Sequence, residues 1–178
     1  MAPSNQLLFL GLWHHMLRHW PCLSSLNVKV PIPSALGDLP LLQTIQLEAM
    51  AGMYGPIPSS FAKLCHLQFL FISGTSISGS IPDFLVKTNL SALSITNSKL
   101  NGSIPESLSL LPNLRVIDLS GNMLTGSIPP GFPGNSRFLI LPNNQLTGEI
   151  PDDYGDGDID TIDLSHNQLI GNQPIVLV

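Results

Sequence analysis

The chain has 178 residues, of which 43% are hydrophobic and 11% are charged, and its formal net charge is -5. This balance disfavours a nucleic-acid-binding function, because contacts to phosphate need clustered lysine and arginine, and the seven such residues here are scattered. No apolar run approaches the length that a bilayer-spanning helix requires, so we predict no membrane span.

Residues 1–30 do not follow the pattern that organises the rest of the chain. Leu7 to Trp13 has the apolar character of a secretory signal core, but no lysine or arginine precedes it and no small-residue cleavage site follows. We therefore interpret residues 1–30 as a divergent leader or a degenerate N-terminal cap. His15 and His19 are spaced to share one helix face, but we interpret them as incidental rather than as zinc ligands.

A repeated unit organises the chain from residue 31 onward and is complete in Leu111 to Pro129. Its pattern, L-x-x-L-x-L-x-x-N-x-L-x-G-x-I-P, is typical of a leucine-rich repeat, in which a short strand is followed by a turn and a return path. An Ile-Pro pair recurs every 22 to 25 residues, at Ile32, Ile57, Ile81, Ile104, Ile128 and Ile150. The fourth residue after each isoleucine is large: Leu36, Phe61, Leu85, Leu108, Phe132 and Tyr154. One such coil cannot bury its own apolar edge, so stability must come from stacked neighbours.

Each unit also contains a stretch in which apolar and exposed positions alternate, as in a half-buried strand. The apolar pairs are Ile45/Leu47, Leu70/Ile72, Leu93/Ile95, Ile117/Leu119, Leu139/Leu141 and Ile162/Leu164. We predict an α/β-type repeat: a right-handed leucine-rich-repeat solenoid with one parallel sheet of about six strands on its concave face and short 3-10 or irregular segments on its convex face. This domain would cover residues 31–178, with about six repeats and no recognisable C-terminal cap.

The asparagine position of the unit holds asparagine only in the later repeats. In chain order its occupants are Met50, Thr75, Ser98, Asn122, Asn144 and Asn167. A buried asparagine there is expected to satisfy backbone groups that a tight turn leaves unpaired, which serine and threonine do in part and methionine cannot. One extra residue lies between Leu47 and Gly55, compared with the next repeat, so we predict a different turn path there.

An acidic run near the end of the chain holds half of all the carboxylates, at Asp152, Asp153, Asp156, Asp158, Asp160 and Asp163. Calcium binds several oxygen ligands, but the run fails the EF-hand pattern because Thr161 occupies the place of the turn glycine. We interpret it as a solvated acidic turn and predict no metal and no cofactor. Motifs of nucleophilic catalysis and nucleotide binding are also missing, so we predict no catalytic residues and no enzyme activity.

The sequence leaves the state of its two cysteines, Cys22 and Cys65, undecided. Two free thiols are favoured over a disulfide, although a free cysteine would be unusual in a secreted protein. N-x-S sequons begin at Asn89 and Asn101, and both would accept N-linked glycans if the chain enters the secretory pathway.

Strand residues that do not enter the core would project from the concave face and stack into ladders. The candidate protein-binding residues on these ladders are Thr44, Gln46, Phe69, Phe71, Ser94, Val116, Asp118, Phe138, Ile140, Thr161 and Asp163. Aromatic anchors among small polar residues resemble the centre of a protein interface. Alternatively, the aromatic side chains only cover neighbouring strands; we favour binding, because solenoids generally use the concave surface.

The stretches GSIPESLSLLPNLRVIDLSGNMLTGSIP, NNQLTGEIP and IDLSHNQLIGN resemble the plant-specific class of leucine-rich repeats, which is marked by L-x-G-x-I-P. Within that class, GPIPSSFAKLCHLQFLFIS and SGSIPDFLVKTNLSAL are most similar to polygalacturonase-inhibiting proteins. Members of that family are secreted cell-wall proteins that bind fungal or insect pectin-degrading enzymes. The resemblance therefore implies an extracellular plant defence protein whose partner is an endopolygalacturonase, blocked by the concave face.

Two other functions remain open. The first is a fragment or relative of a leucine-rich-repeat receptor ectodomain, which shares the same repeat. The second is a plant ice-binding (antifreeze) protein, since some of these resemble polygalacturonase inhibitors. Ice binding would need a flat, regular polar row, and the asparagine row is irregular in the first half of the chain, so this alternative ranks below the other.

Overall fold

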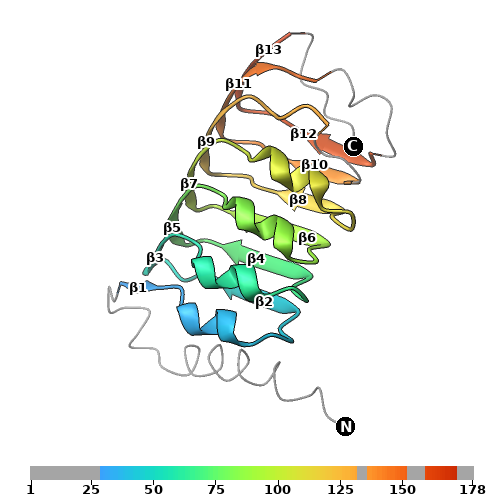
Figure 1. Cartoon of the computed structure of the whole chain (residues 1–178). Helices are drawn as coiled ribbons and strands as arrows, with labels where there is room; N and C mark the ends of the chain where they lie inside the picture. The colour runs from blue at the N-terminus through green and yellow to red at the C-terminus, as the bar shows by residue number, and fades with distance from the viewer. Residues whose placement is uncertain (1–28, 132–135, 152–158, 172–178) are drawn as a thin grey trace.

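A computed structural model of the chain describes residues 29–131, 136–151 and 159–171, which form stacked coils of strands and short helices (Figure 1). Several predictions fall outside these ranges: those on the leader up to residue 28, and those on His15, His19, Cys22, Phe132, Tyr154, Asp152, Asp153, Asp156 and Asp158.

One side of the stack is a six-stranded parallel sheet, in the order β12-β10-β8-β6-β4-β2. Its strands are β2 (Thr44–Glu48), β4 (Phe69–Ser73), β6 (Ala92–Thr96), β8 (Val116–Asp118), β10 (Phe138–Ile140) and β12 (Thr161–Asp163). The apolar positions of successive coils pair in register, for example Leu70 with Leu93 and Leu93 with Ile117. All six predicted strands and their alignment are therefore confirmed.

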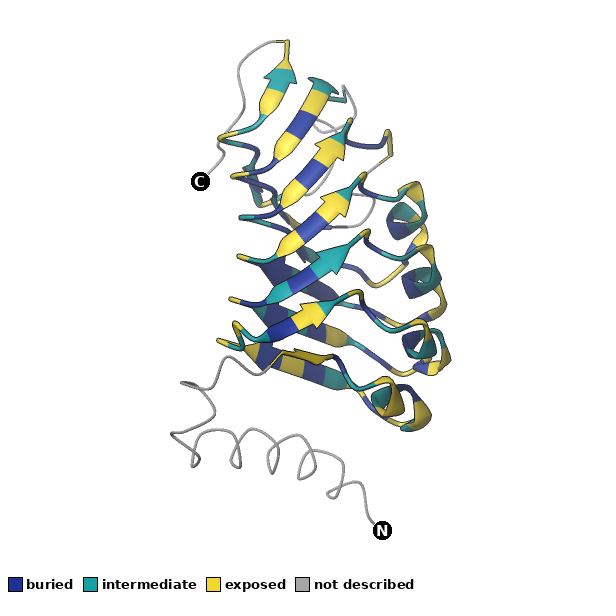
Figure 2. Ribbon diagram, turned by 90° about the vertical axis from the view of Figure 1, so that its left-hand side faces the viewer, coloured by how far each residue is buried: buried dark blue, intermediate teal, exposed yellow. Residues whose placement is uncertain are grey.

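A second parallel sheet, of seven strands, was not predicted. Its strands are β1 (Val30–Pro31), β3 (Met53–Gly55), β5 (Ser76–Gly79), β7 (Lys99–Gly102), β9 (Met123–Gly126), β11 (Gln145–Glu149) and β13 (Gln168–Ile170). Figure 2 looks onto this sheet and shows buried and exposed residues alternating along its strands. The x-L-x-G part of each repeat, which we predicted as turn, thus forms a strand. Strands β3, β5, β7, β9 and β11 each have a single buried apolar residue, whereas Leu169 of β13 is only partly buried. The expectation of one sheet was incomplete.

Short 3-10 helices form the remaining side of the first four coils (Figure 1). They are η1 (Ser34–Asp38), η2 (Ser59–Lys63), η3 (Asp83–Lys87) and η4 (Glu106–Leu110). Each begins directly after the proline of an Ile-Pro pair, which is the N-cap residue. Proline suits this place because its fixed φ is compatible with a helix start and it lacks the N–H that the first turn cannot pair.

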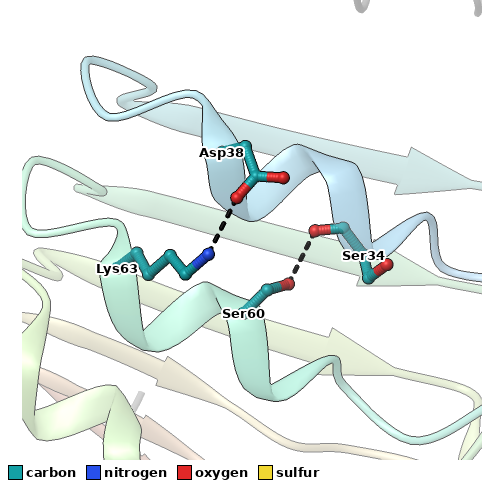
Figure 3. A network of polar contacts seen from close by, with 4 residues as sticks. All are labelled: Ser34, Asp38, Ser60 and Lys63. Carbon is teal, nitrogen blue, oxygen red and sulfur yellow. Dashed lines mark hydrogen bonds and ion pairs between the residues drawn. The ribbon is translucent and has the colours of Figure 1, made fainter.

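Polar contacts connect the first two helices at the surface (Figure 3). Lys63 Nζ lies 2.8 Å from Asp38 Oδ1, and the Ser60 hydroxyl donates a hydrogen bond to the Ser34 carbonyl oxygen at 2.7 Å. Both charged side chains are well exposed, so the ion pair contributes little to stability. The apolar core between the three sides is the main source of stability.

That core is one continuous cluster built from the predicted apolar rows. Phe61, Leu85 and Leu108 are buried within it, whereas Leu36 of the first coil is only partly buried. Each coil contributes one set of side chains and contacts the sets above and below, which is how a solenoid obtains a core that no single coil could form.

The asparagine row has the predicted role and also links neighbouring coils. Asn144 Nδ2 donates to the carbonyl oxygens of Leu141 in its own coil and Leu119 in the preceding coil, at 3.1 and 2.9 Å. Its Oδ1 accepts the backbone N–H of Leu124 in the preceding coil at 3.1 Å. Asn122 and Asn167 make equivalent bonds.

The earlier coils replace this amide link. The hydroxyls of Thr75 and Ser98, in neighbouring coils, lie 2.8 Å apart, and the Thr75 hydroxyl oxygen accepts the N–H of Ile77 in its own coil. In the first coil, Met50 instead packs partly against the core, and the Met53 N–H donates to the Met50 carbonyl oxygen at 2.8 Å. This bond closes the turn that contains the extra residue, so the predicted difference in path is confirmed.

Gly37, in η1, permits the close approach of the first two helices. It is buried, and a Cβ at this position would overlap the backbone carbonyl of Ser60 in η2. We expect Gly37→Ala to lower the free energy of unfolding by roughly 1–3 kcal/mol, because backbone must shift to relieve the overlap. Urea denaturation followed by circular dichroism would measure this. Ala35→Ser, at an exposed position of the same helix, is the control, and equal stability of the two variants would contradict the expectation.

Candidate protein-binding face

The eleven candidate residues lie on the outward side of the six-stranded sheet, which we call the concave face. The strand register forms two ladders: Thr44, Phe69, Ala92, Val116, Phe138 and Thr161, and then Gln46, Phe71, Ser94, Asp118, Ile140 and Asp163. A third ladder continues with Glu48, Ser73 and Thr96 and, just beyond the shorter strands, Ser120, Pro142 and Ser165. The neighbours of these residues along each strand point into the core.

Two apolar patches lie on this face, one on β4 and one on β10. Phe69 and Phe138 are each 37% exposed, while Phe71 and Ile140 are half-buried, less exposed than the sequence suggested. The rings of Phe69 and Phe71 stack with their centroids 6.1 Å apart and their planes 19° from parallel. Ala92, on the neighbouring strand β6, is buried although it belongs to the same ladder. Part of the aromatic surface thus covers neighbouring residues, and part remains accessible.

The charged side chains of the concave face are all acidic: the three ladders hold Glu48, Asp118 and Asp163 and no lysine, arginine or histidine. Asp118 Oδ1 accepts hydrogen bonds from the backbone N–H of Ser120 at 3.1 Å and from its hydroxyl at 2.7 Å. Asp163 Oδ1 accepts the N–H of Ser165 at 3.0 Å. These local bonds hold each carboxylate in place on the face and use only one of its two oxygens.

An ion pair at the edge of this face was missed by the sequence analysis. The residues just before β10 and β12 are Arg137 and Asp160, whose Nη2 and Oδ1 atoms are 2.7 Å apart. Both belong to the row that precedes each strand and continues the hydrogen bonding between coils. Arg137 and Asp160 are one repeat apart in the sequence, which is the only sequence feature that could have indicated the ion pair. The pair could be predicted from this spacing only if the register of this row were known.

The remaining candidate features are metal ligands, the cysteine thiol, the glycosylation sequons and a membrane span. Across the described ranges, no three His, Cys, Asp or Glu side chains gather where they could hold a metal ion. Cys65 is exposed with a free thiol, 3.3 Å from His66 Nδ1. Asn89 and Asn101 are both exposed, and Asn89 Oδ1 accepts a hydrogen bond from Asn113 at 2.8 Å. Within the same described residues, no helix is long and apolar enough to cross a membrane.

Comparison with known proteins identifies the repeat class. The family model described as Leucine Rich Repeat matches residues 66–87 and 113–135. Polygalacturonase inhibitor 1 of Oryza sativa subsp. japonica is 47% identical to this chain over 51 residues. These residues are 29% of this chain and 15% of the rice protein. This chain is a plant leucine-rich-repeat protein that resembles polygalacturonase inhibitors.

Solved structures of plant leucine-rich-repeat proteins agree with this assignment. A plant ice-binding protein superposes with a TM-score of 0.75 and 37% identity, over 79% of this chain and 46% of that one. The ectodomain of the Arabidopsis thaliana membrane receptor kinase GASSHO1/SCHENGEN3 superposes with a TM-score of 0.76 and 37% identity, over 81% of this chain and 18% of that one. The solenoid prediction is confirmed, and the comparisons point to a non-catalytic, protein-binding module. The chain covers less than half of each of these relatives.

Proposed function

We propose that this leucine-rich-repeat protein inhibits a pectin-degrading enzyme, a fungal or insect endopolygalacturonase, by covering part of that enzyme with its concave face. The observation that carries the proposal is the pair of accessible aromatic side chains on that face, Phe69 and Phe138, taken with the similarity to a polygalacturonase inhibitor. No chemistry by this protein is required. A complementary surface that keeps the polysaccharide out of the enzyme's cleft is sufficient.

The acidic character of the concave face supports the same partner. Pectate is a polyanion, so the enzymes that cleave it tend to have basic clefts. A face whose three ladders carry carboxylates and no cations would be steered toward such a cleft. Asp118 and Asp163 lie on the second ladder, next to the apolar patch of β10. The aromatic patches would provide most of the affinity, and the carboxylates would increase the rate of association.

The test is reducing-end release from polygalacturonate by a panel of fungal and insect endopolygalacturonases, with and without the purified chain. Phe138→Ala is expected to weaken inhibition about 30-fold, because truncating a central aromatic anchor costs about 2 kcal/mol. Leu110→Ala is the matched control, since Leu110 is an exposed apolar residue of η4, away from the concave face. Inhibition that is absent across the panel, or equally sensitive to both substitutions, would refute the proposal.

An extracellular, cell-wall location belongs to the same proposal. It is supported by the similarity to polygalacturonase inhibitors and to a receptor ectodomain. A receptor-like binding module is the alternative within this location, and it would use the same concave face. Asn89 and Asn101 would then be glycan acceptors, and neither lies on the three ladders of that face.

Ice binding is a second candidate, and its site would be the seven-stranded sheet. Small polar residues stand on neighbouring strands there, namely Ser78, Asn101, Thr125 and Thr147. The similarity to a solved plant ice-binding protein favours this candidate. However, the strands are staggered, so Lys99 lies beside Ser78 and Met123 beside Asn101. Exposed long side chains therefore interrupt the small polar row, and the flat, regular surface that ice requires is broken.

We expect a glycan on Asn101 to separate the two candidate functions. Asn101 is exposed on β7, the middle strand of the seven-stranded sheet, so a glycan there would cover that surface and leave the concave face free. Ser103→Ala removes the sequon but keeps Asn101. Enzyme inhibition should be the same for the wild-type chain and this variant secreted from plant cells, while the intact mass falls by one glycan.

Both forms should also be assayed for inhibition of ice recrystallisation. Activity that appears only in Ser103→Ala would show that the glycan covers an ice-binding surface. Loss of enzyme inhibition in Ser103→Ala, or an unmodified Asn101 in the secreted wild-type chain, would contradict the expectation.

A further inference from the structure

On the second ladder of the concave face, acidic and apolar side chains alternate across the last three strands. Ile140 of β10 pairs in register with Asp118 of β8 on one side and with Asp163 of β12 on the other. Phe138 lies beside Ile140 on the first ladder, between Val116 and Thr161. The surface thus presents one apolar patch flanked by two carboxylates, with no ion pair to either carboxylate among the described residues.

The backbone separation of Asp118 and Asp163 restricts the shape of a partner. Adjacent strands are about 4.8 Å apart, so positions two strands apart are separated by roughly 9.6 Å. A polyproline II segment rises about 3.1 Å per residue with three residues per turn, so its residues i and i+3 project from the same side about 9.3 Å apart. An extended β segment instead places same-side residues i and i+2 about 6.6 Å apart. The backbone spacing of Asp118 and Asp163, two strands apart, therefore matches the polyproline II repeat.

We propose that the concave face binds an extended, basic protein segment in the polyproline II conformation, with cations at positions i and i+3 on Asp118 and Asp163. One of the two intervening residues lies over Phe138. Charge complementarity selects the occupant, because the three ladders carry carboxylates and no cations. The inference rests on the proposed function in one respect: if the partner is an endopolygalacturonase, the bound segment would be a surface loop of that enzyme.

The physical basis for affinity is the low cost of ordering such a segment. A polyproline II segment is already extended before binding, so it loses little conformational entropy, and proline rings pack well on aromatic side chains. The carboxylates are also held in place in advance, since Asp118 and Asp163 each accept a hydrogen bond from the residue two positions later. Preorganisation on both sides favours a weak but geometrically selective interaction.

The inference is tested with two fluorescent peptides of identical composition, PPRPPRPP and PPPRPRPP. Their arginines are at i and i+3 in the first and at i and i+2 in the second, so they differ in spacing and not in charge. Fluorescence anisotropy at low salt should show that the wild-type chain binds the first peptide at least threefold more tightly. Asp118→Asn and Asp163→Asn should each weaken its binding about threefold to fivefold, as expected for a partly exposed ion pair, and abolish the preference.

Asparagine keeps an oxygen that can accept the Ser120 or Ser165 N–H, so these substitutions remove charge without removing the local bonds. Glu48→Gln is the matched control, because Glu48 is a carboxylate of the same face but lies on β2. Equal binding of the two peptides, no binding of either, or an equal effect of Glu48→Gln would overturn the inference. A chain that inhibits an endopolygalacturonase yet fails this peptide test would keep the proposed function and lose only the inference.

Discussion

Phe61→Ala is expected to lower the free energy of unfolding by about 4 kcal/mol. Phe61 is fully buried in η2 and is one of the largest side chains of the core. Its truncation removes buried apolar surface and leaves a cavity, which the stacked helices on either side can fill only in part. Urea denaturation followed by circular dichroism would measure the loss.

Two further phenylalanine variants show whether burial is the cause. Phe61→Leu should cost only about 1 kcal/mol, because the equivalent positions of the next two coils are occupied by Leu85 and Leu108. Phe69→Ala, at an accessible position of the concave face, should cost less than about 1 kcal/mol. If Phe69→Ala destabilised the fold as much as Phe61→Ala, the aromatic patch of β4 would have a structural role and its assignment to binding would fail.

Asn144→Ala is expected to lower the free energy of unfolding by about 3 kcal/mol. The Asn144 side chain is buried and bonds to the N–H of Leu124 and to the carbonyl oxygens of Leu119 and Leu141. Alanine would leave these backbone groups unpaired and shielded from water, and an unsatisfied buried polar group costs about 1–3 kcal/mol. Two of the three groups belong to the preceding coil, so the loss should also weaken the stacking of the two coils.

The matched control for this prediction is the adjacent asparagine, Asn143, which is exposed and has a φ of 57°. Glycine adopts that conformation readily, so Asn143→Gly should change stability by less than about 0.5 kcal/mol. Asn144→Ser should fall between the two, because a single hydroxyl can replace only some of the bonds that the Asn144 amide makes. Hydrogen exchange of the Leu124 amide would localise the effect, and unchanged protection in Asn144→Ala would contradict it.

The sequence by itself determined the coils, the strands of the concave face and the core. Leucine and isoleucine recur at positions that only stacked coils can bury together, and the Ile-Pro pairs mark where each coil turns into a helix. The same periodicity identified the ladder residues, because side chains alternate across a strand. The candidate site was therefore predictable as a set of positions on one face, from Phe69 near one end to Asp163 near the other.

The tertiary structure decided what depends on contacts between coils. The seven-stranded sheet exists because the x-L-x-G segments pair with one another, and their two-residue stagger places Met123 beside Asn101. The residue just before the asparagine position of each coil has a positive φ, in the left-handed region. These residues are of several types, so the sequence did not predict their shared conformation: Ala49, Gly74, Asn97, Gly121, Asn143 and His166. The strand register also decides that Arg137 pairs with Asp160 and that Asp118 and Asp163 lie two strands apart. The physical reason is common to all of them: a repeat pattern specifies which residues each coil buries, but hydrogen bonds between coils decide which exposed residues become neighbours.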